Sequence, residues 1–278
     1  MNAAKITRDS KSNLALAFVA LGRERRNDIT VFYAFCRVID DIADSSEARS
    51  EQKAKELQAW RKWIRESAAS EPELARDVRG LYAQYSITPE MLDEIIDGVE
   101  MDLRNVRYQT FEELRLYCYR VASAVGLVSI EIFGYRNAAC RDYAIQLGLA
   151  LQMTNIIRDV GKDLNNGRVY LPLEDLAWCD YAESDLRARR YNDGFVRLME
   201  FESRRAEEFF SRAAALLPRE DRRSMVAAEI MASVYHALLR RMKTDRFRVF
   251  DKEYRLSKIE KSGRVAGQLL RLCLNARR

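Results

Sequence analysis

Helix-breaking residues are scarce in this chain, and that scarcity limits what it can fold into. Its 278 residues include only 4 prolines and 11 glycines, against average usages of about 5% and 7%. Because proline interrupts a helix and glycine weakens one, long stretches are free to stay helical. Apolar residues recur at helical spacing in most of these stretches, as in Val31, Ala34, Phe35 and Val38. We therefore predict long helices and no sheet.

Turn-forming residues divide the sequence into about eight or nine helical segments with short connections. Thr110 with Glu113 three residues later is typical of a capping box, which begins a helix at Phe111. No repeat, low-complexity tract or linker divides the chain, so we predict one all-α domain over residues 1–278. The expected breaks lie at Gly22, 45–50, 70–72, 86–89, 134–137, 165–167, 191–194 and 217–218.

The composition excludes several classes of chemistry. There is one histidine, His236, so a zinc site or a nucleophile that depends on histidine would rest on that residue alone. The five cysteines include no Cys-x-x-Cys pair, which favours a reducing compartment. Basic residues exceed acidic ones by 47 − 42 = 5 and are interleaved with them. This pattern is typical of solvated helix faces rather than of a nucleic-acid surface.

The sequence shows no signal peptide or membrane span. Residues 1–12 are polar, and the longest apolar run, Leu14 to Leu21, is far shorter than the roughly 18 residues that a span requires. We therefore expect a cytoplasmic protein. The basic and apolar segment from Arg264 to Arg278 is a candidate for lying on a membrane surface.

Two pairs of aspartates stand out by their surroundings. Acidic pairs four residues apart occur about as often as chance predicts, so the spacing alone carries no information. Asp40 and Asp44, however, follow one long apolar helical segment, and Asp159 and Asp163 follow another. Burying such carboxylates costs several kcal/mol each unless a cation compensates their charge.

Two interpretations of these aspartates are open. In the first they form buried salt-bridge networks, because Arg37 and Arg158 lie beside them in the sequence. In the second they bind Mg²⁺, which prefers oxygen ligands and shares its coordination sphere with phosphates. A polar stripe that includes Gln152 and Asn155 accompanies the second pair. Two such clusters with apolar walls would suit an amphiphile that carries a diphosphate on a hydrocarbon chain.

Three motifs, in this order, closely resemble those of the squalene/phytoene synthases: Tyr33 to Asp44, Tyr117 to Gly126 and Leu151 to Pro172. These enzymes join two prenyl diphosphates head to head. The resemblance extends from about Ser10 to Lys261. It implies the isoprenoid-synthase helical bundle with a central apolar cavity.

The resemblance also implies roles for individual residues. Tyr117 would face a carbocation, where its ring and hydroxyl steady positive charge or assist proton removal. The four aspartates and Tyr117 would form the catalytic set. The implied ligands of Mg²⁺, or of Mn²⁺, are Asp40, Asp44, Asn155, Asp159 and Asp163. The implied substrate-binding residues are Ser10, Ser12, Tyr33, Arg37, Val121, Ala122, Val125, Gly126, Gln152, Asn155, Arg158, Arg168 and Tyr170.

Within the family, Tyr117 to Gly126 with Ile132 to Gly134 looks most like the bacterial presqualene diphosphate synthases. We therefore expect two farnesyl diphosphates to condense through presqualene diphosphate towards squalene. Phytoene synthesis from two geranylgeranyl diphosphates is the alternative, since Asn155 to Pro172 fits both. Use of NADPH is left open. Downstream isoprenoid enzymes are candidate partners.

Two other classes of protein are considered. Asp40-Asp41-x-x-Asp44 also fits the Asp-rich motif of chain-elongating prenyltransferases and terpene cyclases, but their second acidic motif differs from the one that ends at Asp163. A non-catalytic helical assembly factor would be expected to have lost the metal carboxylates, and all four are present here.

Overall fold

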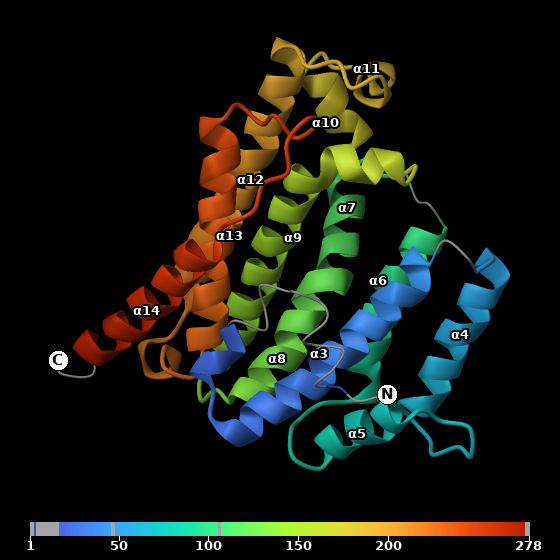
Figure 1. Cartoon of the computed structure of the whole chain (residues 1–278), viewed down its shortest axis with the longest axis vertical. Helices are drawn as coiled ribbons and strands as arrows, with labels where there is room; N and C mark the ends of the chain where they lie inside the picture. Colours follow the sequence, from blue (N-terminus) through green and yellow to red (C-terminus); the bar gives the residue numbers. More distant parts are fainter. Residues whose placement is uncertain (1–2, 4–16, 46–47, 105–106, 276–278) are drawn as a thin grey trace.

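The computed structural model describes residue 3 and residues 17–45, 48–104 and 107–275. Over these ranges the chain is helical and has no strand, as predicted. In Figure 1 the helices pack side by side around α9, with α12 and α13 on one side and α3, α6, α7 and α8 on the other. The elements in chain order are η1 (Phe18–Ala20), α3 (Arg23–Asp44), α4 (Ser50–Trp63), α5 (Glu73–Tyr82), α6 (Pro89–Leu103), α7 (Phe111–Cys118), η2 (Tyr119–Ser123), α8 (Ala124–Phe133), α9 (Ala139–Asn165), α10 (Leu173–Trp178), α11 (Glu183–Arg187), α12 (Asp193–Leu216), η3 (Arg219–Asp221), α13 (Val226–Thr244) and α14 (Lys258–Asn275).

Each predicted break separates two helices. The break between α13 and α14, at residues 245–257, was not predicted, because this stretch contains neither proline nor glycine. Its turn instead places Arg246 and Phe247 at φ angles of 49° and 56°. Such left-handed backbone is uncommon for residues other than glycine. The buried side chain of Phe247 helps to hold this turn.

The predicted helix start at Phe111 is confirmed. The hydroxyl of Thr110 accepts a hydrogen bond from the backbone N–H of Glu113 (3.4 Å). The carboxylate of Glu113 accepts one from the backbone N–H of Gln109 (2.6 Å), one residue before the cap itself. These bonds pair backbone donors that a helix start otherwise leaves free.

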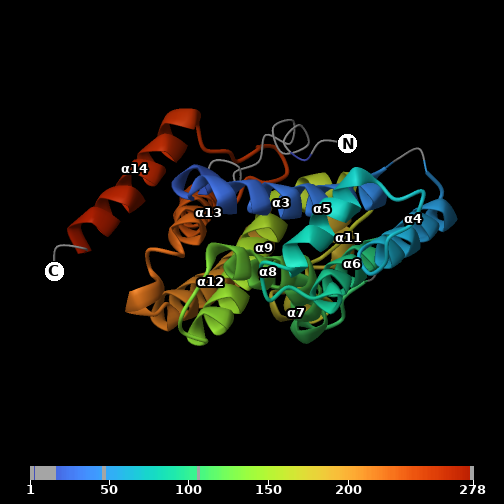
Figure 2. The same cartoon turned by 90° about the horizontal axis from the view of Figure 1, so that it is seen from below.

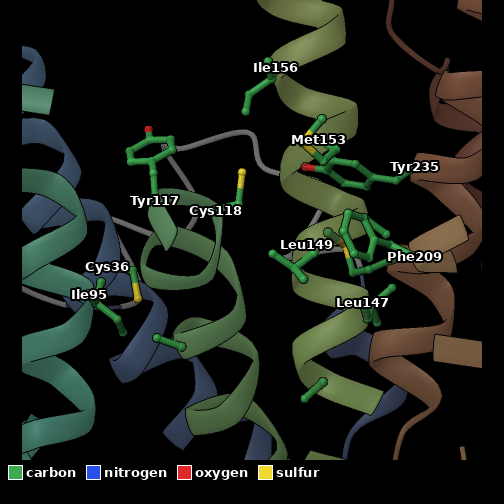
Figure 3. Close-up of a cluster of buried hydrophobic side chains, with 14 of the residues drawn as sticks. Cys36, Ile95, Tyr117, Cys118, Leu147, Leu149, Met153, Ile156, Phe209 and Tyr235 are labelled. Atoms are coloured by element: carbon green, nitrogen blue, oxygen red, sulfur yellow. The ribbon is translucent and has the colours of Figure 1, made fainter. Parts of the chain in front are cut away.

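The centre of the core is α9. Figure 3 shows its side chains Leu149 and Met153 between Phe209 of α12 and Tyr235 of α13 on one side and Tyr117 of α7 on the other. Leu149 and Met153 are fully or nearly fully buried. Polar groups near the end of α9 are therefore held on a rigid, close-packed support.

The π-helical turn η2 lies between two glycines of neighbouring helices. A Cβ added to Gly98 of α6 would lie 2.7 Å from a methyl carbon of Val121, and one added to Gly148 of α9 would lie 2.5 Å from the Cα of Ser123. These glycines let α6 and α9 approach η2 more closely than any other residue would allow. The close approach brings the end of α6 beside Tyr117.

The helix Phe111–Phe133, formed by α7, η2 and α8, is long and apolar enough to cross a membrane by length and composition. It is the one such helix among the described residues. Its charged residues Arg120 and Glu131 interrupt the apolar run, so the sequence does not show it as a continuous stretch. Of its most apolar stretch, 56% is buried inside the protein. Packing by α6 and α9 accounts for this apolar character.

Replacement of Gly148 tests the close packing at η2. We expect Gly148→Ala to destabilise the protein by about 1–3 kcal/mol, the usual cost of overpacking, although alanine favours a helix. The matched control is Gly80→Ala in α5, where an added Cβ meets nothing within 4 Å. That variant should gain up to about 1 kcal/mol. Urea unfolding of both variants measures the difference, and equal stabilities would contradict this explanation.

Candidate active site

A cavity of about 260 Å³ opens where α3, α6, α7, η2 and α9 meet, and the segment after α9 completes its wall. Eleven residues predicted from the sequence line it: Asp40, Asp44, Tyr117, Val121, Gln152, Asn155, Arg158, Asp159, Asp163, Arg168 and Tyr170. Its other lining residues are Ala43, Val99, Asp102 and Ile156. The lining is mostly polar, and the fold has thus gathered both aspartate pairs around one space.

The α3 wall of the cavity carries Asp40 and Asp44, one helical turn apart. Water reaches Asp40 through the cavity, but the carboxyl lies deep between helices, and this burial raises its pKa to about 7. The charge of Arg37 opposes the shift, and that of Asp44 adds to it. Asp44 accepts a hydrogen bond from Arg168 across the cavity (Nη1 to Oδ1, 2.9 Å). This ion pair joins α3 to the segment that follows α9.

The α9 wall carries Asp159 and Asp163, also one turn apart. Arg158 donates two hydrogen bonds to its neighbour Asp159, at 2.8 and 2.5 Å. Asp163 has no such pair of hydrogen bonds from an arginine in the described part of the chain. Burial, together with the charge of Asp159, raises the pKa of Asp163 to about 7. One turn before Asp159, the amide of Asn155 donates to Oε1 of Gln152 (3.2 Å).

The side-chain oxygens in this cavity are suitable ligands for a hard divalent cation. Among the described residues that line the cavity, Arg158 and Arg168 are the basic ones. The side-chain oxygen Oδ1 of Asn155 is buried without a hydrogen-bond partner, so it is free to bind a cation. The carboxylates that share the space are Asp40, Asp44, Asp102, Asp159 and Asp163. Carboxylate and amide oxygens are the ligands that Mg²⁺ prefers.

No three acidic, cysteine or histidine side chains in the described ranges form a ready-made metal cluster. The carboxylates instead stand in pairs on two walls. A cation on such a pair would need further ligands, and Mg²⁺ commonly takes these from water and from substrate phosphates. The arrangement therefore suits a metal that binds together with a phosphorylated ligand.

A network that sequence reasoning missed centres on Asp102 of α6. It accepts hydrogen bonds from the hydroxyl of Tyr117 (3.0 Å) and from that of Tyr170 (2.7 Å). The two tyrosine rings stack with centroids 5.1 Å apart. Burial raises the pKa of Tyr117 well above its usual value and also raises that of Asp102. The hydroxyl of Tyr117 therefore stays protonated and fixed in direction at neutral pH.

A sequence signal for Asp102 does exist. It continues the apolar stripe of Ile95 and Val99 at helical spacing, so it lies on the buried face of α6. A search for acidic pairs passes over a lone aspartate of this kind.

Five predicted site residues within the described ranges do not line the cavity. Tyr33 packs edge-on against Phe18 (6.1 Å between centroids), and Arg37 forms an ion pair with Asp41. Gly126 lies against α9, where an added Cβ would be 3.1 Å from the carbonyl oxygen of Ala144. The half-buried Ala122 and Val125 are also absent from the lining, and Ser10 and Ser12 lie outside the described residues.

Comparison with known proteins gives a consistent result. The family model described as squalene/phytoene synthase matches residues 7–260. A presqualene diphosphate synthase of Rhodopseudomonas palustris is 37% identical over 231 residues, which cover 82% of each chain. A phytoene synthase of Mycobacterium tuberculosis is 34% identical over 267 residues, which cover 95% of this chain and 88% of the relative.

Two crystal structures share the fold. A dehydrosqualene synthase superposes with a TM-score of 0.84 at 24% identity and covers 97% of this chain and 95% of its own. A squalene synthase from Alicyclobacillus acidocaldarius gives a TM-score of 0.76 at 26% identity and covers 88% of this chain and 93% of its own. The predicted class of all-helical fold is thereby confirmed.

The raised pKa values predict how stability depends on pH without divalent cations. Asp40 and Asp163 titrate near pH 7 in the folded protein, whereas an unfolded aspartate titrates near 3.9. Between these values the folded state binds more protons, so stability falls as the pH rises. We expect Asp163→Asn to flatten this fall and to raise the Tm by a few degrees at pH 8, since 1 kcal/mol corresponds to about 2–4 °C for a chain of this size.

Thermal unfolding in EDTA between pH 5 and 8 measures this effect. The matched control is Asp142→Asn, an exposed carboxylate in the first turn of the same helix. It should leave the slope unchanged. Identical slopes for the wild type and Asp163→Asn would contradict the burial of an unpaired charge at Asp163.

Proposed function

The chain belongs to the squalene/phytoene synthase family of prenyltransferases, and we propose that it joins two farnesyl diphosphates head to head, through presqualene diphosphate, towards squalene. One observation carries this proposal: two aspartate pairs face one cavity that Tyr117 and two arginines also line. Such a cavity can hold the charged end of the substrate and a cationic centre within one enclosure.

We assign the binding of Mg²⁺, or of Mn²⁺, to Asp40 and Asp44 on one wall and to Asn155, Asp159 and Asp163 on the other. The bound metal would neutralise the diphosphate and make it a better leaving group. The unpartnered oxygen of Asn155 and the unmatched carboxyls of Asp40 and Asp163 support this assignment.

In the first half of the proposed reaction, the bond between C1 of one farnesyl group and its diphosphate breaks. The double bond of the second molecule attacks the allylic cation, and loss of one proton closes a cyclopropane ring. Two farnesyl diphosphates thus give presqualene diphosphate, one diphosphate and one proton. Arg168 and Arg158 would bind the departing diphosphate, because both guanidinium groups line the cavity.

Tyr117 would act on the cation itself. Its ring is stacked on Tyr170, and both hydroxyls are held by Asp102, so an aromatic face and a proton acceptor lie together. The ring would stabilise positive charge. The Tyr117–Asp102 pair would accept the proton. The raised pKa of Asp102 brings this carboxyl closer to a base that works near neutral pH.

Synthesis of phytoene from two geranylgeranyl diphosphates is the second candidate function. It is supported by the phytoene synthases of Mycobacterium tuberculosis and Synechococcus elongatus, which are 34% and 33% identical to this chain. The presqualene diphosphate synthase, at 37%, favours the farnesyl substrate.

A product assay tests the choice of substrate. The enzyme is incubated with Mg²⁺ and either farnesyl or geranylgeranyl diphosphate, with and without NADPH, and the products are identified by mass spectrometry. We expect presqualene diphosphate from the farnesyl substrate, and squalene with NADPH if the enzyme completes the second half. A higher kcat/KM for geranylgeranyl diphosphate would contradict the proposal.

The metal assignment is tested in the same assay. We expect EDTA to abolish turnover and Asp159→Ala to lower kcat/KM by about 100-fold or more, the usual scale for loss of a major electrostatic contact in the transition state. Asp142→Asn, on the same helix but outside the cavity, is the matched control and should retain activity. Unchanged turnover without Mg²⁺ or without the Asp159 carboxylate would exclude this mechanism.

The tyrosine network predicts a different kinetic signature. Asp102→Asn should lower kcat by about 10²-fold with a smaller change in KM, because the contacts to diphosphate remain. Tyr117→Phe should behave in the same way, and the double variant should be little worse than either single one, since the two groups act as a unit. Additive losses would show that Asp102 and Tyr117 act separately.

A further inference from the structure

The side of α14 that faces the protein makes polar contacts with α13, beside the partly buried Val265 and Leu272. Arg264 donates to the backbone carbonyl and the hydroxyl of Ser233, both at 3.0 Å. One turn later, Gln268 donates to the backbone carbonyl of Glu229 (3.4 Å). Glu260 forms an ion pair with Arg241. Polar contacts thus fasten α14 to α13. Figures 1 and 2 both show α14 at an edge of the molecule, extending away from the other helices.

The opposite side of α14 is apolar and exposed. Ile259 is 84% exposed, Leu270 61% and Leu274 58%, and helical spacing puts them on one face. Between them this face carries only small residues such as Gly263 and Ala266, with no charge. With Leu269, four of the seven large apolar side chains that are exposed in the described ranges belong to this helix.

The exposed apolar stripe departs from the usual arrangement of a surface helix. A surface helix of a globular protein buries its apolar stripe and exposes its charges. A contiguous exposed apolar stripe marks a surface that another body covers. The stripe runs along most of the helix, whose 18 residues span about 27 Å.

The charge of the chain is concentrated in the same segment. From Lys258 to Arg278 the sequence has six basic residues and one acidic residue, a net charge of 6 − 1 = +5. The whole chain has 47 − 42 = +5. Residues 1–257 are therefore neutral on balance, with 41 basic and 41 acidic residues, and the entire positive excess lies in the last 21 residues.

We propose that α14 docks the protein on the surface of a bilayer that contains anionic lipids, with the helix axis in the membrane plane. Ile259, Leu270 and Leu274 would enter the boundary between headgroups and acyl chains, and Lys258 and Arg271, at the two borders of the stripe, would contact the anionic headgroups. A helix with an apolar face and basic borders binds an interface in this way. Because the stripe extends along most of α14, the helix can contact a surface over most of its length when its axis lies parallel to that surface.

A second copy of the chain fits this surface less well. A symmetric contact brings the same patch of both copies together. Here it would place two copies of α14 side by side, each with a net charge of 4 − 1 = +3, whereas anionic headgroups neutralise that charge.

Flotation with lipid vesicles tests the proposal. The full chain is mixed with vesicles of phosphatidylcholine that contain about 30 mol% phosphatidylglycerol, or none, at low and high salt. We expect the protein to bind the anionic vesicles, with an affinity that falls as the salt concentration rises. Binding to the neutral vesicles should be weaker by at least about 10-fold. Equal binding to both compositions, or binding to neither, would overturn the proposal. The vesicles hold no prenyl diphosphate, so the result does not depend on the enzymatic activity.

The double variant Leu270→Glu, Leu274→Glu keeps the contacts to α13, because both side chains point to solvent. It should partition about 10-fold less into anionic vesicles, with an unchanged Tm. The matched control is Trp178→Glu on α10, whose side chain is 78% exposed. Figure 1 shows α10 in the upper part of the molecule, whereas α14 extends to the lower left. It should bind like the wild type, and a loss of binding equal to that of the double variant would overturn the assignment to α14.

Sedimentation of the protein without lipid shows whether a second copy of the chain, rather than a bilayer, covers the apolar stripe of α14. We expect the wild type and the double variant to sediment as species of the same size. A concentration-dependent dimer that the double variant abolishes would show that a second copy covers the stripe, and this would overturn the proposal.

Discussion

The burial of carboxylates beside one another in one cavity is the constraint on which the rest of this structure depends. Three helices bring five aspartates to a single space, and two arginines share it among the described residues. Burial, together with the charges of neighbouring carboxylates, raises the pKa of Asp40 and Asp163 to about 7. A chain that adopts this arrangement needs either protons or metal ions in the cavity. Uptake of protons, or of the metal ions that we propose, is therefore favoured by the whole arrangement and does not depend on a single residue.

Such an arrangement persists only on a rigid support. The two aspartate pairs stand at the ends of long helices that bury their apolar faces in the core. Gly98 and Gly148 let α6 and α9 close on the π turn η2, and this closure places Asp102 against Tyr117. The same packing that encloses the charges thus orients the aromatic group that would meet the cation. A π turn at a functional site is a recurrent feature of helical proteins.

Much of this architecture could be predicted from the sequence. Helix boundaries marked by proline, glycine or a capping threonine were predicted correctly, because those residues act on the local backbone. The turn at residues 245–257 was not, because Arg246 and Phe247 adopt left-handed backbone that tertiary packing imposes. Asp102 was missed for a related reason. Its role depends on Tyr117 and Tyr170, which lie 15 and 68 residues away in the sequence.

The resemblance to a family predicted site residues that helical periodicity alone could not identify. The structure divides these residues into those that line the cavity and those that serve packing. Tyr117, Val121, Arg168 and Tyr170 line the cavity, but Gly126 serves the packing of α8 against α9, where a small residue is needed for close approach. A shared motif therefore combines residues that face the cavity with residues that position them. The sequence alone does not distinguish the two, since Val121 lines the cavity and Val125, one turn later, does not.

The central claim is that both aspartate walls bind one diphosphate through metal ions. Calorimetric titration with an unreactive farnesyl thiodiphosphate, with and without Mg²⁺, tests it most directly. We expect binding that requires Mg²⁺ and that becomes at least about 10-fold weaker with Asp40→Asn on α3 and, equally, with Asp163→Asn on α9. Affinity that is independent of Mg²⁺, or that is lost with one variant and retained with the other, would contradict it.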